Sequence, residues 1–158
     1  MQNLAVSKIN RLIKECDKHQ YRIKSAYGKI QPKLPLTLAL YSQLTDEDIE
    51  HIDQFIFRFS KLQDAIGQRF FKAMLTFLEE DVEGVPFIDI LNKLEKFQLI
   101  ESADQWKQLR EIRNTIAHEY DDSPELMVQV LNSVFDARIE LFAIYENLKQ
   151  VYQSRKKE

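Results

Sequence analysis

The stretch TDEDIEHIDQFIFRFSKLQDAIGQRFFKAMLTFL, residues 45–78, decides the fold of this chain. Its apolar residues recur at spacings of three and four, which is the period of one face of an α-helix. Thr45, followed by Asp48 three residues later, resembles a capping box, so we expect a helix that begins there and runs to about Leu78. The apolar stripe comprises Ile52, Phe55, Phe59, Leu62, Ile66, Phe70, Ala73 and Phe77.

A helix of this length is a rod of roughly 50 Å, because each residue adds about 1.5 Å. Short helices cannot cover such a rod, so we expect either the C-terminal helix or a second subunit to pack along it. Two charged residues interrupt the rod, Arg58 and Asp64. Two interpretations of Asp64 stay open: an exposed surface charge, or a carboxylate that holds an arginine or a histidine from another helix.

A second amphipathic helix precedes this stretch, over residues 4–27, with Gly28 as its expected end. Its apolar stripe comprises Ala5, Ile9, Leu12, Cys16, His19 and Ile23. We interpret His19 as a partly buried structural histidine, since no second ligand residue stands at metal-binding spacing from it. Pro32 and Pro35 break the helix, and we expect the apolar connection after it to cross the core as extended chain with a short turn.

Three further helices are predicted after the rod. One begins at Pro86, a residue favoured in the first helical turn, and continues to Phe97. The next begins at the capping box of Ser102 and Gln105. The last runs over about residues 125–154.

Scarce turn residues favour long elements, and the chain has only three glycines and four prolines. No stretch has the pattern of a strand. We therefore predict an all-α fold of about five helices in a single domain, residues 1–158. Residues 1–44 hold the N-terminal helix and the proline-containing connection, and residues 45–154 form the helical core.

Composition restricts the classes of function. Apolar residues make up 44% and charged residues 30%, and the net charge is −3. An acidic chain has no global basic field, so contact with nucleic acid must come from a local cluster. The single cysteine, Cys16, excludes an internal disulfide and a cysteine-based metal cluster. With no membrane-length apolar run and no apolar core of a signal peptide, we expect a cytoplasmic protein without membrane partners.

Reactive side chains concentrate in RNTIAHEY, residues 113–120, near the predicted end of a helix. Each residue advances about 100° around a helix, which separates two faces here. The apolar face holds Leu109, Ile112 and Ile116, with Tyr120 at its border, and the polar face holds Arg110, Arg113, Asn114 and His118. Asn114 and His118 stand four residues apart, so the amide can orient the imidazole.

This polar face suits the cleavage of a phosphodiester. Arginine offers a planar fork of donors to phosphate, and histidine exchanges a proton with the ester oxygens near neutral pH. Together they can cleave RNA without a metal or a cofactor, through attack of the 2′-OH on the adjacent phosphorus. One histidine serves poorly as both acid and base, so we expect a two-fold homodimer that brings two copies of the motif together.

A simpler interpretation of the same residues stays open, because the spacing of Arg113 and His118 is a weak signal by itself. In it, Arg113 forms surface ion pairs with Glu111 or Glu119. His118 is then a C-terminal helix residue that the helix dipole favours.

The stretch RNTIAHEY resembles the R-x4-H-x-Y signature of HEPN-domain proteins, specifically the HepT-like toxins that are paired with small nucleotidyltransferase antitoxins. The similarity extends over residues 45–150, through FIFRFSKLQDAIGQRFF on the rod and W-x6-R-N-x3-H-x-Y after it. The resemblance implies an up-and-down α-helical bundle that forms a two-fold homodimer, with the motif at the dimer cleft. It also implies a metal-independent endoribonuclease that acts on RNA such as tRNA or mRNA.

The resemblance assigns roles to residues as well. It implies that Arg113 and His118 are the catalytic pair, that Asn114 supports them, and that Asp64 faces the site from the rod. Arg110 is a further candidate on the same polar face. Tyr120 matches the tyrosine to which a cognate nucleotidyltransferase adds AMP, and a phosphate and an adenine beside Arg113 would silence the toxin.

Two rival functions stay open. The first is a non-catalytic HEPN protein that serves a nucleotidyltransferase as its substrate, regulatory or antitoxin subunit. The second is a plain helical interaction module. The first 44 residues have no clear counterpart in the minimal family pattern, and we expect them to cover the cleft or to bind the partner.

Overall fold

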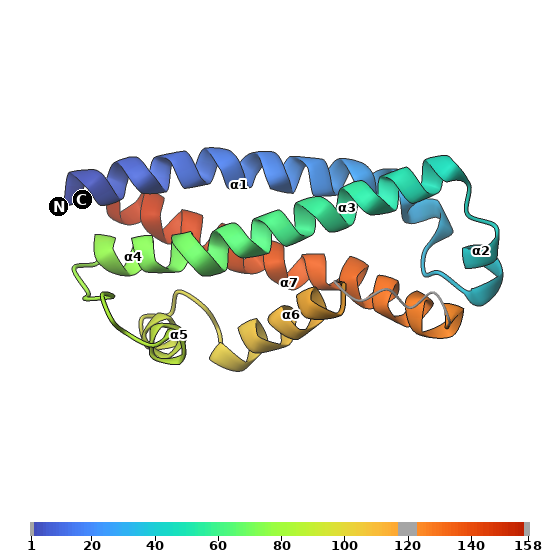
Figure 1. The fold of residues 1–158 in the computed structure, drawn as a ribbon. Coiled ribbons are helices and arrows are strands. Elements are labelled where there is room, and N and C mark those ends of the chain that lie inside the picture. The colour runs from blue at the N-terminus through green and yellow to red at the C-terminus, as the bar shows by residue number, and fades with distance from the viewer. Residues whose placement is uncertain (1, 117–122, 157–158) are drawn as a thin grey trace.

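Three long helices build the molecule. The computed structural model describes residues 2–116 and 123–156, and all regular structure in these two ranges is helical, which confirms the predicted all-α class. Figure 1 shows α1 (Gln2–Ile30) above a second long helix, with α7 (Pro124–Lys156) behind them. The second long helix consists of α3 (Asp46–Ala65), a π-helical turn η2 (Ile66–Phe70) and α4 (Phe71–Phe77).

This second long helix, formed by α3, η2 and α4 and called the central helix below, follows the predicted rod closely. Thr45 caps it through a complete capping box, because its hydroxyl accepts from the Asp48 amide at 3.1 Å and the Asp48 carboxylate accepts from the Thr45 amide at 2.9 Å. Its apolar stripe is buried from Ile52 to Ala73, and Phe77 is half-buried at the end. The periodicity of the sequence therefore identified the correct face.

The covering of this rod confirms the expected contact with the C-terminal helix and adds a second cover. The C-terminal helix α7 packs against the rod, with Phe135 against Phe55 and Tyr152 against Phe77. The N-terminal helix α1 packs along both α3 and α4 as well, which was not expected. It also continues through Gly28 to Ile30, so the predicted end at Gly28 is two residues early. Because α1 covers the rod within one chain, the length of the rod no longer argues for a dimer.

The connection after α1 is more ordered than the predicted extended chain. It contains a short 3₁₀ turn, η1 (Gln31–Lys33), and a one-turn helix, α2 (Leu38–Ser42), which packs against α7. Between them the backbone of Leu36 exchanges two hydrogen bonds of 2.9 Å with the side chain of Asn132 on α7. The connection therefore fastens the end of α1 to α7.

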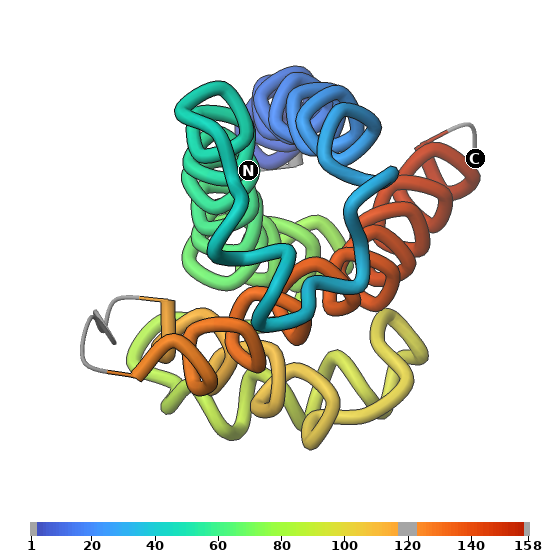
Figure 2. Tube along the Cα trace, turned by 90° about the vertical axis from the view of Figure 1, so that its right-hand side faces the viewer, coloured from blue at the N-terminus to red at the C-terminus, as the bar shows by residue number. Residues whose placement is uncertain are grey.

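Two shorter helices pack against α7 and α4. They are α5 (Phe87–Lys96) and α6 (Ala103–Ile116), with the hydroxyl of Ser102 accepting from the Gln105 amide at the start of α6 as predicted. The helix α6 packs against α7 and α5, and α5 packs against α4 (Figures 1 and 2). Among the described helices, none combines the length and the apolar character needed to cross a membrane.

A polar cluster ties α1 to the central helix. Glu15 on α1 accepts two hydrogen bonds from the Arg69 guanidinium, at 2.9 and 2.6 Å. One turn further on, Nε2 of His19 lies 3.3 Å from Glu15, and Nδ1 lies 3.1 Å from the Arg58 guanidinium. His19 is 7% exposed, so its predicted burial is confirmed.

Acid is expected to destabilise the fold through this cluster. Hydrogen bonds from Arg69 hold the pKa of Glu15 below its usual 4.5. Burial, assisted by the charges of Arg58 and Lys61 and opposed by Glu15, holds the pKa of His19 below its usual 6.5. Both groups bind fewer protons in the folded chain than in the unfolded chain. The free energy of unfolding therefore begins to fall below about pH 6.5 through His19 and below about pH 4.5 through Glu15.

Urea unfolding between about pH 7 and about pH 5 measures the histidine part. The variant His19→Gln should lose less stability over this interval than wild type. His51→Gln is the matched control, because His51 belongs to a different pair, 3.6 Å from Glu47 on α3. Equal pH dependence in wild type and His19→Gln would contradict the prediction.

Candidate functional site

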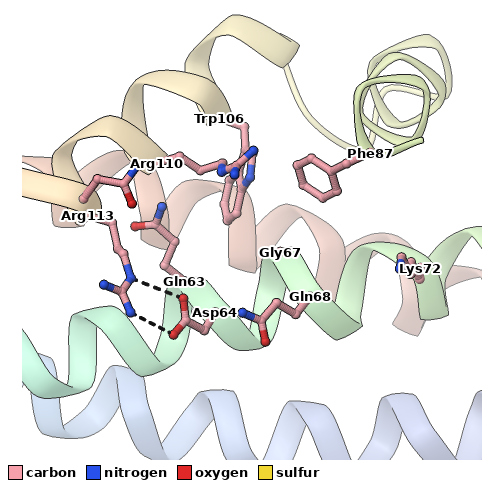
Figure 3. Close-up of a pocket in the computed structure, with 10 residues that line it drawn as sticks. Gln63, Asp64, Gly67, Gln68, Lys72, Phe87, Trp106, Arg110 and Arg113 are labelled. Atoms are coloured by element: carbon pink, nitrogen blue, oxygen red, sulfur yellow. Dashed lines mark hydrogen bonds and ion pairs between the residues drawn. The ribbon is translucent and has the colours of Figure 1, made fainter. Parts of the chain in front are cut away.

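Four of the predicted site residues lie on two neighbouring helices. Asp64 occupies the last turn of α3, and Arg110, Arg113 and Asn114 occupy the last two turns of α6. The helix α6 buries Trp106 and Leu109 and leaves Arg110 and Asn114 exposed, as its predicted apolar and polar faces require. This orientation directs the polar face of α6 towards α3 (Figure 3).

Asp64 and Arg113 form a two-point ion pair. The Nε of Arg113 donates to Oδ1 of Asp64 at 3.4 Å, and Nη2 donates to Oδ2 at 3.2 Å (Figure 3). The structure thus selects the second interpretation of Asp64, a carboxylate that holds an arginine. The ion pair uses Nε and Nη2, and it leaves the donors of Nη1 for another acceptor.

These residues border a pocket of about 480 Å³, a volume in the range of small-ligand sites. The pocket lies between the central helix, α6 and the start of α5. Its lining comprises Gln63, Asp64, Gly67, Gln68 and Lys72 from the central helix, Trp106, Arg110, Arg113 and Asn114 from α6, and Phe87 from α5. The sequence pattern alone did not predict that Lys72, Phe87 and Gln63 line this site.

The pocket is a local concentration of positive charge on an acidic chain. Lys72, Arg110 and Arg113 line it against the single carboxylate of Asp64, whereas the whole chain carries a net charge of −3. The Arg110 guanidinium also lies over the ring of Phe87, 5.3 Å from the ring centroid. Such a set of donors is suited to an anion, and an arginine fork is suited to a phosphate in particular.

The floor of the pocket depends on a close contact between α6 and the central helix. A Cβ atom added to Gly67 would stand 2.7 Å from the Cζ2 atom of Trp106, so the indole lies directly on the backbone there. Gly67 belongs to the π-helical turn η2. Turns of this kind are rare and often occur at functional sites.

The sequence did contain a signal for Gln68 and Lys72. Asp64, Gln68 and Lys72 are spaced four residues apart and so form one polar stripe on the central helix. That stripe stands beside the apolar one and lines the pocket. Phe87 gave no comparable signal, because an aromatic residue at the start of an amphipathic helix is usually part of a core.

His118 and Tyr120 lie outside the described residues, which leave out residues 117–122. The predicted contact between Asn114 and His118 therefore stays a prediction, and so does the position of Tyr120 beside Arg113. Neither the models of known protein families, nor the curated proteins, nor the solved structures include a match to this chain.

Proposed function

We propose that this chain is a HEPN-like, metal-independent endoribonuclease, the toxin of a pair with a nucleotidyltransferase antitoxin. The observation that supports this proposal most is the cationic pocket in which Asp64 holds Arg113 by two hydrogen bonds. The same pocket collects Arg110 and Lys72 on a chain that is acidic as a whole. Substrate RNA would therefore be attracted locally, at the place where the motif supplies reactive groups.

In the proposed reaction, the 2′-oxygen of a ribose bonds to the adjacent phosphorus and the bond from phosphorus to the 5′-oxygen breaks. His118 accepts the proton of the 2′-OH, and His118 of the second copy in a two-fold homodimer donates a proton to the leaving 5′-oxygen. The free donors of Arg113 stabilise the charge that develops on the phosphoryl oxygens, while Asp64 fixes the guanidinium. Asn114 orients the imidazole, and no cofactor takes part.

The proposal includes a way to silence the enzyme. Addition of AMP to Tyr120 by the cognate nucleotidyltransferase would place a phosphate and an adenine beside Arg113. The added phosphate would then occupy the arginine donors that the RNA phosphate needs. Partner binding and catalysis would accordingly compete for one cationic site.

The test is cleavage of tRNA and mRNA by the purified chain in the presence of EDTA. We expect cleavage that leaves a 2′,3′-cyclic phosphate and a 5′-OH, and growth arrest when the chain is expressed without its partner. His118→Ala should abolish both effects, whereas His51→Ala, on α3, should abolish neither. Intact RNA and normal growth with the wild-type chain would refute the ribonuclease. Co-purification with a nucleotidyltransferase under those conditions would favour the non-catalytic HEPN subunit.

A further inference from the structure

Two buried polar atoms at the floor of the pocket have no hydrogen-bond partner within the part of the chain that the structure describes. They are the side-chain Oε1 of Gln63, an acceptor, and the Nε1 of Trp106, a donor. The two residues are 2% and 1% exposed. One other such atom occurs among the described residues, Nε of Arg58, which belongs to the cluster between α1 and α3. Two of the three unpaired atoms therefore lie at one pocket.

An unpaired buried donor or acceptor destabilises a fold, because the group has lost water without gaining a partner. A leucine of similar size at residue 63 would avoid this cost. The side chain of Gln63 instead points from the central helix towards α6, and the residue lines the pocket (Figure 3). The last torsion of a glutamine side chain has a broad distribution, so the amide can turn when a ligand enters the pocket.

The walls above this floor suit a flat, polar ring beside a phosphate. Phe87 points from α5 towards Arg110 and Trp106 (Figure 3), and the Arg110 guanidinium lies 5.3 Å from the centre of its ring. Aromatic rings and arginine planes are the surfaces on which unpaired RNA bases stack. Lys72, Arg110 and Arg113 supply the charge that a flanking phosphate requires.

We propose that the pocket binds one unpaired base of the RNA substrate and that Gln63 is the residue that reads the edge of this base. Every base edge carries a donor next to an acceptor. The donor can pair with Oε1 of Gln63, which is buried in the structure and has no partner among the described residues. The base contacts Phe87 and its phosphate contacts Arg110 and Lys72. This inference rests on the proposed ribonuclease function, whose substrate it specifies as single-stranded at the cleavage site.

A simple anion would use only part of this site. Inorganic phosphate can pair with the three cations, but it is repelled by the acceptor of Gln63 and leaves the wall of Phe87 empty. A nucleotide satisfies the cations, the amide and the aromatic wall together. The base is therefore expected to contribute to affinity beyond the phosphate.

Trp106 provides a direct measurement, because it is the only tryptophan of the chain and it lines the pocket. Its fluorescence is titrated with the four ribonucleoside 5′-monophosphates, with ribose 5-phosphate and with inorganic phosphate. We expect at least one of the four nucleotides to change the fluorescence with an affinity about tenfold or more above that of ribose 5-phosphate. Equal affinities for all nucleotides and ribose 5-phosphate would refute the base site and leave an anion site only.

The variant Gln63→Leu separates a binding role from a structural one. We expect it to weaken nucleotide binding about tenfold and to melt at the same temperature as wild type or higher, because an unpaired acceptor is removed. Gln20→Leu is the matched control, a buried glutamine on α1, 7% exposed, and its affinity for nucleotides should equal that of wild type. Unchanged binding by Gln63→Leu, or equal weakening by both variants, would overturn the role of Gln63.

RNA cleavage by the same preparations distinguishes the two proposals. If the wild-type chain cleaves RNA and Gln63→Leu retains full rate and base preference, the base site fails and the ribonuclease stands. If nucleotides bind in the Gln63-dependent manner but RNA stays intact, the base-reading site stands and the ribonuclease fails. A shift of the preferred base at the cut by Gln63→Leu would support both.

Discussion

Arg113→Ala is expected to slow RNA cleavage by about 10²–10³-fold, which is the usual cost of removing one preorganised donor from a developing oxyanion. The reason lies in the ion pair with Asp64. It holds the guanidinium at the pocket by two hydrogen bonds of 3.4 and 3.2 Å and leaves Nη1 without a partner among the described residues. The measurement is the single-turnover rate on a short RNA, with EDTA present. Arg11→Ala, an exposed arginine on α1, is the control and should cleave at the wild-type rate.

Asp64→Ala tests whether Asp64 acts through Arg113. Without the carboxylate the guanidinium keeps its charge but loses its fixed orientation, so we expect a smaller loss of about tenfold in rate. In the double variant, the loss should equal that of Arg113→Ala alone, because a positioning residue has nothing left to position. Full additivity of the two losses would show that Asp64 acts independently. Equal rates for Arg113→Ala and Arg11→Ala would remove Arg113 from the reaction.

Local sequence patterns were sufficient to predict the longer helices of this chain, although not the short helix α2, because each pattern involves residues within one or two helical turns. The capping box at Thr45, the hydroxyl cap at Ser102 and the buried stripe of the rod all depend on residues that are near one another in sequence. The helix α1 was placed for the same reason, although Gly28 did not end it. An exposed glycine near a helix end is tolerated when the following turn still forms.

Such patterns could not predict which helix packs against each apolar face. Periodicity shows which side of the rod is buried and carries no information about the helix that buries it. The sequence therefore left the C-terminal helix and a second subunit as alternatives. The structure places α7 against the rod, for example through Phe135 on Phe55, and adds α1, which the sequence did not suggest as a cover. The consequence for function is direct. The homodimer now rests on the need for a second acid–base group, and no longer on the length of the rod.

Local patterns likewise predicted some residues of the candidate site and not others. Arg113, Asn114 and Arg110 were found because they form one face of one helix, and Asp64 was found as a charge within an apolar rod. The unpaired state of Gln63 was not predictable, since a polar residue beside a buried stripe is usually solvated. Whether it is solvated depends on how α6 packs over the central helix, and that packing includes the close contact of Gly67 with Trp106, two residues distant in sequence.

That contact leads to the largest predicted effect on stability: Gly67→Val should lower the free energy of unfolding by about 2–3 kcal/mol, the cost of overpacking a core. The first added atom would already stand 2.7 Å from Cζ2 of Trp106. The indole cannot easily withdraw, because it is 1% exposed and packs edge-on against Phe71 with a centroid distance of 4.7 Å. Urea unfolding measures the loss.

Gly28→Val is the matched control, since Gly28 is also helical and an added Cβ there meets nothing within 4 Å. Valine has a slightly higher helix propensity than glycine, so this variant should be as stable as wild type or more stable by a few tenths of a kcal/mol. Trp106→Phe should be less destabilising in the Gly67→Val background than in wild type, by about 1 kcal/mol in the free energy of unfolding. The reason is that the smaller ring makes room for the new methyl groups. Equal losses from both glycine variants would mean that backbone freedom, rather than the indole, is what requires glycine at residue 67. The position of α6 over the pocket would then have to be set by other contacts, such as the ion pair between Asp64 and Arg113.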